Sequence, residues 1–159
     1  GYNVMQGYYH LQKETEETID QEGWLHTGDL GFLDERNFLY VTGRLKEMII
    51  RGGENISPKE IEAVISRYPG IRQVKVIGMP VDVLQEMVVA CIITEPGETI
   101  CPEELLASLR EVLSYYKVPS HIFEFEAFPV TASGKIQLEM LRQMVQKQLE
   151  PASIVGRAG

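Results

Sequence analysis

The sequence lacks any apolar run long enough to cross a bilayer, which needs about 20 such residues. One of its longest apolar runs, residues 87–93, falls far short of that length. The first residues also lack the basic stretch followed by an apolar stretch that marks a secretory signal. We therefore expect an intracellular protein, located in the cytoplasm or the mitochondrial matrix.

Cysteine, histidine and positive charge are also scarce. The two cysteines and the three histidines show no metal-ligand spacing, so we predict no disulfide and no structural metal. The net charge of −8 argues against a nucleic-acid-binding surface, which needs a surplus of Lys and Arg on one face. A local anion site remains open, because four basic residues lie near glycines: Arg44, Lys46, Arg51 and Lys135.

Hydrophobic residues make up 44% of the chain, enough for one ordinary core. Residues 1–44 are predicted to form short strands broken by turns, because glycines and the polar run 34–37 separate their apolar patches. Ser57, Pro58 and Glu60 have the spacing of a capping box with proline at the first helical position. A helix should therefore begin at Pro58.

The remaining pattern alternates strands and helices. We expect a strand at 47–51, a pair of buried strands at 74–78 and 87–93, a half-buried edge strand at 122–125, and helices at 102–115 and 136–149. This order predicts an α+β domain over residues 45–149, with a small mixed sheet covered by helices. Residues 150–159 are small and aperiodic, and we expect a disordered tail there.

Three segments carry candidate chemistry, and the first is His26-Thr27-Gly28-Asp29. An ionised Asp after a glycine turn can accept hydrogen bonds from two neighbouring hydroxyls, such as those of a ribose. The alternative is that Asp29 only caps its own turn.

The second segment, residues 43–62, contains Gly52 and Gly53 with cations on either side. Glycines allow the backbone to approach a ligand closely. The alternative is a hairpin with a glycine-rich exit into a capped helix, which leaves Arg44 and Lys46 merely solvated.

The third segment, residues 129–136, is a loop of small residues that presents Lys135 just before a helix. It is not a Walker phosphate loop, because its first glycine is missing at Pro129 and Ile136 replaces the Ser or Thr after the lysine. Taken alone, Lys135 is more simply interpreted as a surface lysine.

In order and spacing, the three segments together resemble the C-terminal motifs of the adenylate-forming superfamily, which includes acyl-CoA synthetases, luciferases and peptide-synthetase adenylation domains. The resemblance covers residues 1 to about 149. Residues 51–58, Arg-Gly-Gly-Glu-Asn-Ile-Ser-Pro, are similar to the matching loop of fatty-acyl and aryl CoA ligases. A medium-chain or related acyl-CoA synthetase is the nearest match.

The resemblance implies a reaction in which a carboxylate and ATP give an acyl-adenylate, from which the CoA thiol then displaces AMP. ATP and CoA are then substrates, and Mg²⁺ accompanies ATP in the full-length enzyme. Asp29 would hold the ribose hydroxyls, with Arg44 near the ribose and phosphate. Lys135 would be the catalytic lysine of adenylation, placed between the attacking carboxylate and the α-phosphate.

Such enzymes rotate their C-terminal domain between the two half-reactions. Lys46 matches the hinge, where the family carries Asp or Lys. Gly52 and Gly53 would line the pantetheine passage after rotation, and two cations are expected to bind CoA phosphates: Arg51 and Lys117. Val130 and Gln137 depart from the usual pattern without affecting the assignment of Lys135.

By the same resemblance, residues 1–44 are the last strands of the AMP-binding N-terminal domain and residues 45–149 the mobile C-terminal domain. The phosphate-binding loop, carboxylate pocket and adenine site of the family belong to the N-terminal domain, so we expect this chain to be inactive alone. Its apolar strands at 1–44 could drive self-association. The alternative is a stand-alone module that binds CoA or a partner protein through residues 51–55, without catalysis.

Overall fold

A computed structural model describes residues 1–150, in which the chain divides into two compact units. The first unit ends at Lys46, and the second begins at Glu47. The division lies two residues beyond the boundary expected at 44/45, inside the 3-10 helix η1 (Leu45–Glu47). The expected tail at 150–159 lies outside the described residues, apart from Glu150. The assignment of the first unit to an N-terminal domain stays a prediction.

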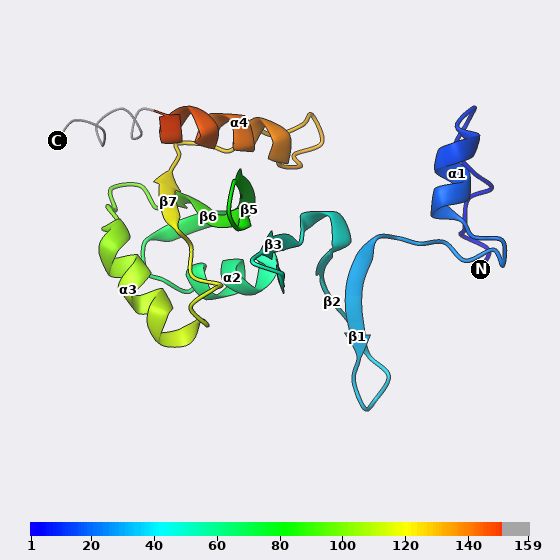
Figure 1. The fold of residues 1–159 in the computed structure, drawn as a ribbon, viewed down its shortest axis with the longest axis horizontal. Helices are drawn as coiled ribbons and strands as arrows, with labels where there is room; N and C mark the ends of the chain where they lie inside the picture. Colours follow the sequence, from blue (N-terminus) through cyan, green and yellow to red (C-terminus); the bar gives the residue numbers. More distant parts are fainter. Residues whose placement is uncertain (151–159) are drawn as a thin grey trace. The chain divides into compact units, whose positions relative to one another are not determined.

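The first unit contains a helix, α1 (Gln12–Thr18), and an antiparallel hairpin of β1 (Asp29–Leu33) and β2 (Leu39–Arg44) (Figure 1). The prediction that this region holds only strands and turns was wrong for α1. That helix buries no residue, so it shows no apolar periodicity. Local polar contacts support it instead, including a 2.7 Å hydrogen bond from Gln12 Nε2 to Glu16 Oε1.

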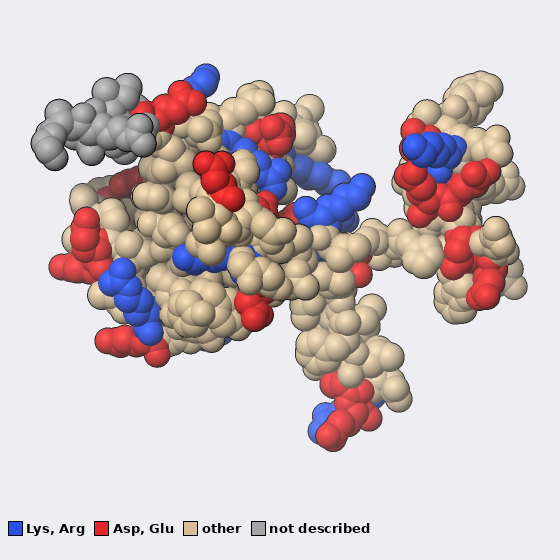
Figure 2. All heavy atoms as spheres, viewed as in Figure 1, with Lys and Arg blue, Asp and Glu red and all other residues tan. Residues whose placement is uncertain are grey.

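The hairpin exposes most of its apolar side chains. Figure 2 shows its surface as largely uncharged, with charged side chains gathered at its tip. Gly43 is the only buried residue of positions 1–46. The large exposed hydrophobic residues of this unit are Tyr2, Tyr8, Tyr9, Leu11, Trp24, Phe32, Leu33, Phe38, Leu39, Tyr40, Val41 and Leu45. This surface has no cover from its own unit, and self-association through it stays a prediction.

The second unit is an α+β domain, which confirms the predicted fold class. Its elements are β3 (Ile49–Arg51), β4 (Glu54–Ile56), α2 (Pro58–Ile65), β5 (Ile71–Val81), β6 (Gln85–Thr94), α3 (Pro102–Val112), β7 (His121–Glu124) and α4 (Leu138–Leu149). The five strands form one mixed sheet in the order β4-β3-β6-β5, and β7 pairs with β6 in parallel. The expected pairing of the two apolar strands is the antiparallel β5–β6 ladder.

Helices cover both faces of this sheet. Figure 1 shows α4 on one side of β5 and β6, and α2 and α3 on the other. Alternate residues of β6 enter two separate cores: Val88, Ala90 and Ile92 pack in the core containing α2 and α3, and Val89, Cys91 and Ile93 in the core containing α4. Burial on both faces explains why residues 87–93 are apolar without alternation.

The helix at Pro58 begins where the sequence predicts, but the capping box does not form. Ser57 makes no side-chain capping hydrogen bond. Glu60, the other half of the expected box, instead bonds Lys117 Nζ through both carboxylate oxygens, at 2.6 and 2.8 Å. The structure therefore confirms two parts of the prediction, the proline at the first helical position and the buried stripe of α2.

The last helix begins two residues later than predicted, at Leu138. Ile136 forms a β-bridge with Val130, and the backbone N–H of Gln137 donates to Pro129 O at 2.8 Å. These contacts hold the chain out of the helix up to Gln137. No helix among residues 1–150 is long and apolar enough to span a membrane.

The two cysteines should differ sharply in reactivity toward iodoacetamide. Burial raises the pKa of Cys91 to about 12, whereas Cys101 is exposed. At pH 8 the folded chain should therefore take up label at Cys101 alone, and both thiols should react in urea. Mass spectrometry of the labelled peptides measures this, with Cys101→Ser as the unlabelled control. Equal labelling of Cys91 and Cys101 in the folded chain would contradict the burial of Cys91.

Gly78 lies against the carboxylate of Glu86, so that a Cβ at position 78 would come within 2.6 Å of Glu86 Oε1. Glu86 Oε2 accepts the Ile50 N–H at 2.7 Å and thereby ties β3 to β6. Gly78→Ala should displace the carboxylate and lower the free energy of unfolding by about 1–2 kcal/mol, measured by urea denaturation. In a Glu86→Ala background the same substitution should cost almost nothing. An equal cost in both backgrounds would rule out this contact as the cause.

Candidate functional site

The structure places the predicted site residues in two groups, one in each unit. Asp29, Arg44 and Lys46 belong to the first unit. The predicted CoA-side residues and Lys135 belong to the second, at the end of β3, in the β3–β4 turn and on two further loops.

Asp29 and Arg44 form a surface ion pair on the β1–β2 hairpin. They are register partners, and Arg44 Nε donates to Asp29 Oδ1 at 3.0 Å. The Asp29 N–H also donates to Thr27 Oγ1 at 3.1 Å. Since Arg44 uses Nε in this pair, its two terminal nitrogens remain able to donate, and a carboxylate and a guanidinium lie side by side. Such a pair can serve the hydroxyls and the phosphate of a nucleotide together.

A second carboxylate, Asp20, organises the turn before Asp29, and no sequence pattern pointed to it. Asp20 accepts the backbone N–H groups of Trp24 and Glu22, and Oδ2 lies 3.0 Å from His26 Nε2. The Trp24 N–H, together with the His26 contact, holds the pKa of Asp20 below its usual value. The side chain of His26 is 62% exposed, which fits the solvated or capping role expected for the histidines.

Gly52 and Gly53 are the central residues of the β3–β4 hairpin, in which Arg51 pairs with Glu54. Both have positive φ, 58° and 87°, as a two-residue turn of type I′ requires. The Gly52 N–H donates to Leu84 O at 3.0 Å. A Cβ on Gly53 would meet no atom within 4 Å. Backbone conformation therefore accounts for both glycines, as in the hairpin alternative, and the role in a pantetheine passage stays a prediction.

The two cations expected to bind CoA phosphates already have protein partners. Arg51 Nη1 donates to the carbonyl oxygens of Tyr116 and Val118, at 3.0 and 3.2 Å. Lys117 pairs with Glu60, and this hydrogen bond raises the pKa of Lys117 above its ordinary value. Arg51 thus hydrogen-bonds the backbone on both sides of Lys117. These contacts bring Arg51 and Lys117, which are distant in sequence, to one edge of the domain.

A hollow of about 300 Å³ lies at this edge. Its lining includes Arg51, Arg110 and Tyr115. Arg110 lies in the last turn of α3, and sequence reasoning passed over it because its position reads as an ordinary solvated helix face.

Lys135 lies on a closed turn. The Thr131 N–H donates to Lys135 O at 2.8 Å, the Gly134 N–H to Thr131 O at 2.9 Å, and the Lys135 N–H to Thr131 Oγ1 at 3.2 Å. Gly134 has a φ of 79°, which this turn requires. Gln137 Nε2 closes the base of the turn by donating to Val130 O at 2.7 Å. The backbone of Lys135 is therefore fixed by its neighbours.

Lys135 is exposed. Within residues 1–150 its ammonium makes no hydrogen bond or ion pair, unlike those of Lys75 and Lys117. In the same described range, no group of three or more His, Cys, Asp or Glu residues is placed to hold a metal. The turn thus presents an unneutralised cation that another molecule can reach.

Comparison with known proteins identifies the type of domain. Residues 60–135 match the AMP-binding enzyme C-terminal domain, and Lys135 is the last matched residue. Over 150 residues the chain is 41% identical to the medium-chain acyl-CoA ligase ACSF2, mitochondrial, of Rattus norvegicus, covering 94% of this chain and 24% of that protein. The match to the AMP-binding enzyme C-terminal domain lies within the second unit.

Other proteins show similar matches. The putative acyl-CoA synthetase YngI of Bacillus subtilis is 42% identical over 143 residues, which cover 90% of this chain and 26% of that protein. The ATP-bound MatB structure from Rhodopseudomonas palustris matches with a TM-score of 0.85 and 35% identity, over 91% of this chain and 29% of that one. The chain spans about a quarter of the length of the curated relatives it matches.

Proposed function

We propose that this AMP-binding C-terminal domain belongs to an ATP-dependent fatty-acyl-CoA synthetase, an acid-thiol ligase. The parent enzyme joins a fatty acid to ATP, releases pyrophosphate, and passes the acyl group from the adenylate to the CoA thiol. The names of two relatives, medium-chain acyl-CoA ligase and putative acyl-CoA synthetase, support this substrate class. The domain works only with the N-terminal part of the same parent chain, and alone it is inactive.

One observation carries the proposal: Lys135 presents an exposed ammonium on a turn that its own backbone hydrogen bonds close. When a carboxylate oxygen attacks the α-phosphate of ATP, negative charge builds on the phosphoryl oxygens. A cation held there stabilises the transition state more than the bound substrates. Because Lys135 has no carboxylate partner among residues 1–150, docking it against a phosphate breaks no existing ion pair.

The remaining predicted residues divide between nucleotide and CoA. Asp29 holds the ribose hydroxyls, and Arg44 contributes its terminal nitrogens near the phosphate. Arg51, Gly52, Gly53 and Lys117 serve the CoA side after the domain rotates about Lys46. Mg²⁺ enters with ATP in the full-length enzyme. The compartment is the mitochondrial matrix or the cytoplasm, and the word mitochondrial in the name of the rat relative favours the former.

Substitution of Lys135 in the full-length parent enzyme tests the proposal. Lys135→Ala should slow pyrophosphate release by about two to three orders of magnitude, because the transition-state cation is lost. Thioester formation from supplied acyl-adenylate and CoA should continue, since no phosphate is activated in that step.

The matched control is Lys147→Ala, which removes an exposed lysine of α4 outside the proposed site and should leave both half-reactions unchanged. The isolated 159-residue chain should release no pyrophosphate. Unchanged pyrophosphate release in the Lys135→Ala parent enzyme would show that this lysine is not catalytic.

A further inference from the structure

The chain segment at the junction of the two units is held on both sides by contacts that stay within one unit. On the first side, the Leu45 N–H donates to Gly28 O at 2.8 Å, just after the Asp29–Arg44 ion pair. These contacts tie the chain to the first unit as far as Leu45.

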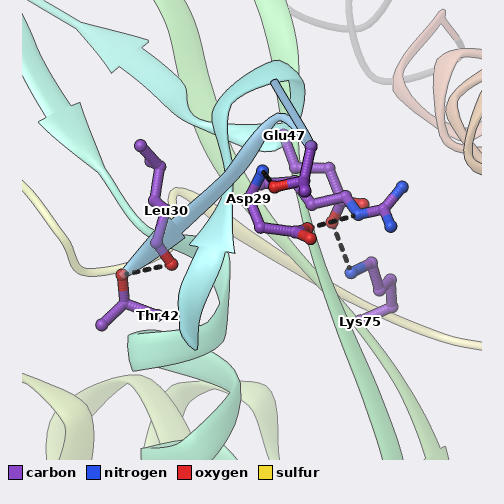
Figure 3. Close-up of polar contacts among 7 residues, drawn as sticks. Asp29, Leu30, Thr42, Glu47 and Lys75 are labelled. Carbon is purple, nitrogen blue, oxygen red and sulfur yellow. Dashed lines mark hydrogen bonds and ion pairs between the residues drawn. The ribbon is translucent and has the colours of Figure 1, made fainter. Parts of the chain in front are cut away.

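In the second unit, the chain is first attached at Glu47. Lys75 Nζ, on β5, contacts Glu47 Oε2 at 3.2 Å and Glu62 Oε1, on α2, at 3.1 Å. Figure 3 shows the side chains of Glu47 and Lys75 meeting. We call Glu47, Lys75 and Glu62 the junction cluster. It fastens the first residue of the second unit to that unit's sheet and helix.

Burial and a backbone hydrogen bond hold the side chains of the junction cluster in place. Its side chains are only 28%, 15% and 18% exposed for Glu47, Lys75 and Glu62, respectively. Glu62 Oε1 also accepts the Val76 N–H at 2.9 Å, which fixes this carboxylate against β5. Lys75 is therefore already oriented by Glu62 when it meets Glu47, so that the contact costs little side-chain entropy.

One residue remains between the two attachments. Lys46 is exposed, and its ammonium makes no hydrogen bond or ion pair within residues 1–150. Leu45 is fixed before it, Glu47 after it, and Ile49 then enters β3 in the buried core. Of the residues of η1, Lys46 is the one that neither attachment holds, so that a turn of its backbone leaves both attachments intact.

We infer that the junction cluster is a positioning device for domain rotation, and that it confines the pivot to the backbone of Lys46. This inference rests on the proposed function, in which the second unit alternates between two orientations. Glu47 and Lys75 touch no substrate and act through the backbone. Without the Glu47 contact, residues 47 and 48 join the pivot, and the unit samples orientations in which Lys135 is not docked.

Glu47→Ala is the sharpest variant for testing this inference. It leaves Lys75 paired with Glu62, so that no buried charge is stranded, and Glu47 is exposed enough for the fold to survive. Hydrogen exchange is measured by mass spectrometry on the full-length parent enzyme. Exchange in the peptide covering residues 45–50 should become about fivefold faster, as expected for loss of one half-buried ion pair.

The control variant is Glu124→Ala, which removes a carboxylate that accepts a 2.6 Å hydrogen bond from Thr94 Oγ1 in the same sheet. It should leave exchange at residues 45–50 unchanged. Glu47→Gln keeps a hydrogen-bond acceptor for Lys75 and should restore part of the protection. Unchanged exchange in Glu47→Ala, or an increase spread evenly over the sheet, would overturn the inference.

Kinetics give the second readout. In Glu47→Ala, kcat should fall about fivefold in both adenylation and thioester formation, while KM for ATP and fatty acid stays unchanged, because orientation and not ground-state binding is affected. Raised KM with normal kcat would contradict a positioning role. If the parent enzyme releases no pyrophosphate while Glu47→Ala still makes exchange at residues 45–50 faster, that result would refute the proposed function and support the role of the junction cluster.

Discussion

Burial of strand β6 on both faces is the constraint on which the rest of the second unit depends. Alternate β6 residues fill two cores, and each core needs its own helices, α2 and α3 on one face and α4 on the other. On one side β6 pairs with β5; along its other side it pairs with β7 and, at Gln85, with β3. Every loop of the second unit with candidate chemistry is therefore held by elements that pack directly on this strand or pair with it.

The two cores around β6 form a rigid body, and the residues with candidate chemistry lie on short segments attached to it. The glycine turn at 52–53 is held by Leu84, at the tip of the β5–β6 hairpin, and the Lys135 turn is closed by its own backbone before α4 begins. Neither segment relies on a long flexible loop. Fixed presentation of this kind suits a mechanism in which a whole domain moves and its side chains keep their local geometry.

The sequence predicted the fold class and the main elements because two strong patterns were present, the uninterrupted apolar run at 87–93 and the Pro58 start with its buried stripe. It missed α1, whose charged face carries no periodicity. It also gave Glu60 to a capping box, although the partner of Glu60, Lys117, lies 57 positions away, a distance at which sequence spacing carries no information. Lys75 offered one usable signal, since a lysine inside an apolar strand needs a carboxylate partner.

The candidate site was predicted as a set of positions but not as a geometry. Motif order located Asp29, Arg44 and Lys135, and hairpin register then explains why Asp29 and Arg44 face each other. No pattern in the chain pointed to Asp20, because the groups that donate hydrogen bonds to its carboxylate include backbone N–H groups of a turn. Contacts between a side chain and backbone depend on conformations that only the folded chain defines.

The partners of Arg51 have an electrostatic consequence. Its guanidinium is hydrogen-bonded by two carbonyl oxygens, which are dipoles and carry no net charge, whereas Lys117 faces a full carboxylate. The charges of Lys117 and Glu60 cancel, whereas no carboxylate within residues 1–150 pairs with Arg51. Arg51 thus keeps an uncancelled positive charge beside the hollow in a half-buried setting, where screening by water and salt is weaker than at an exposed site.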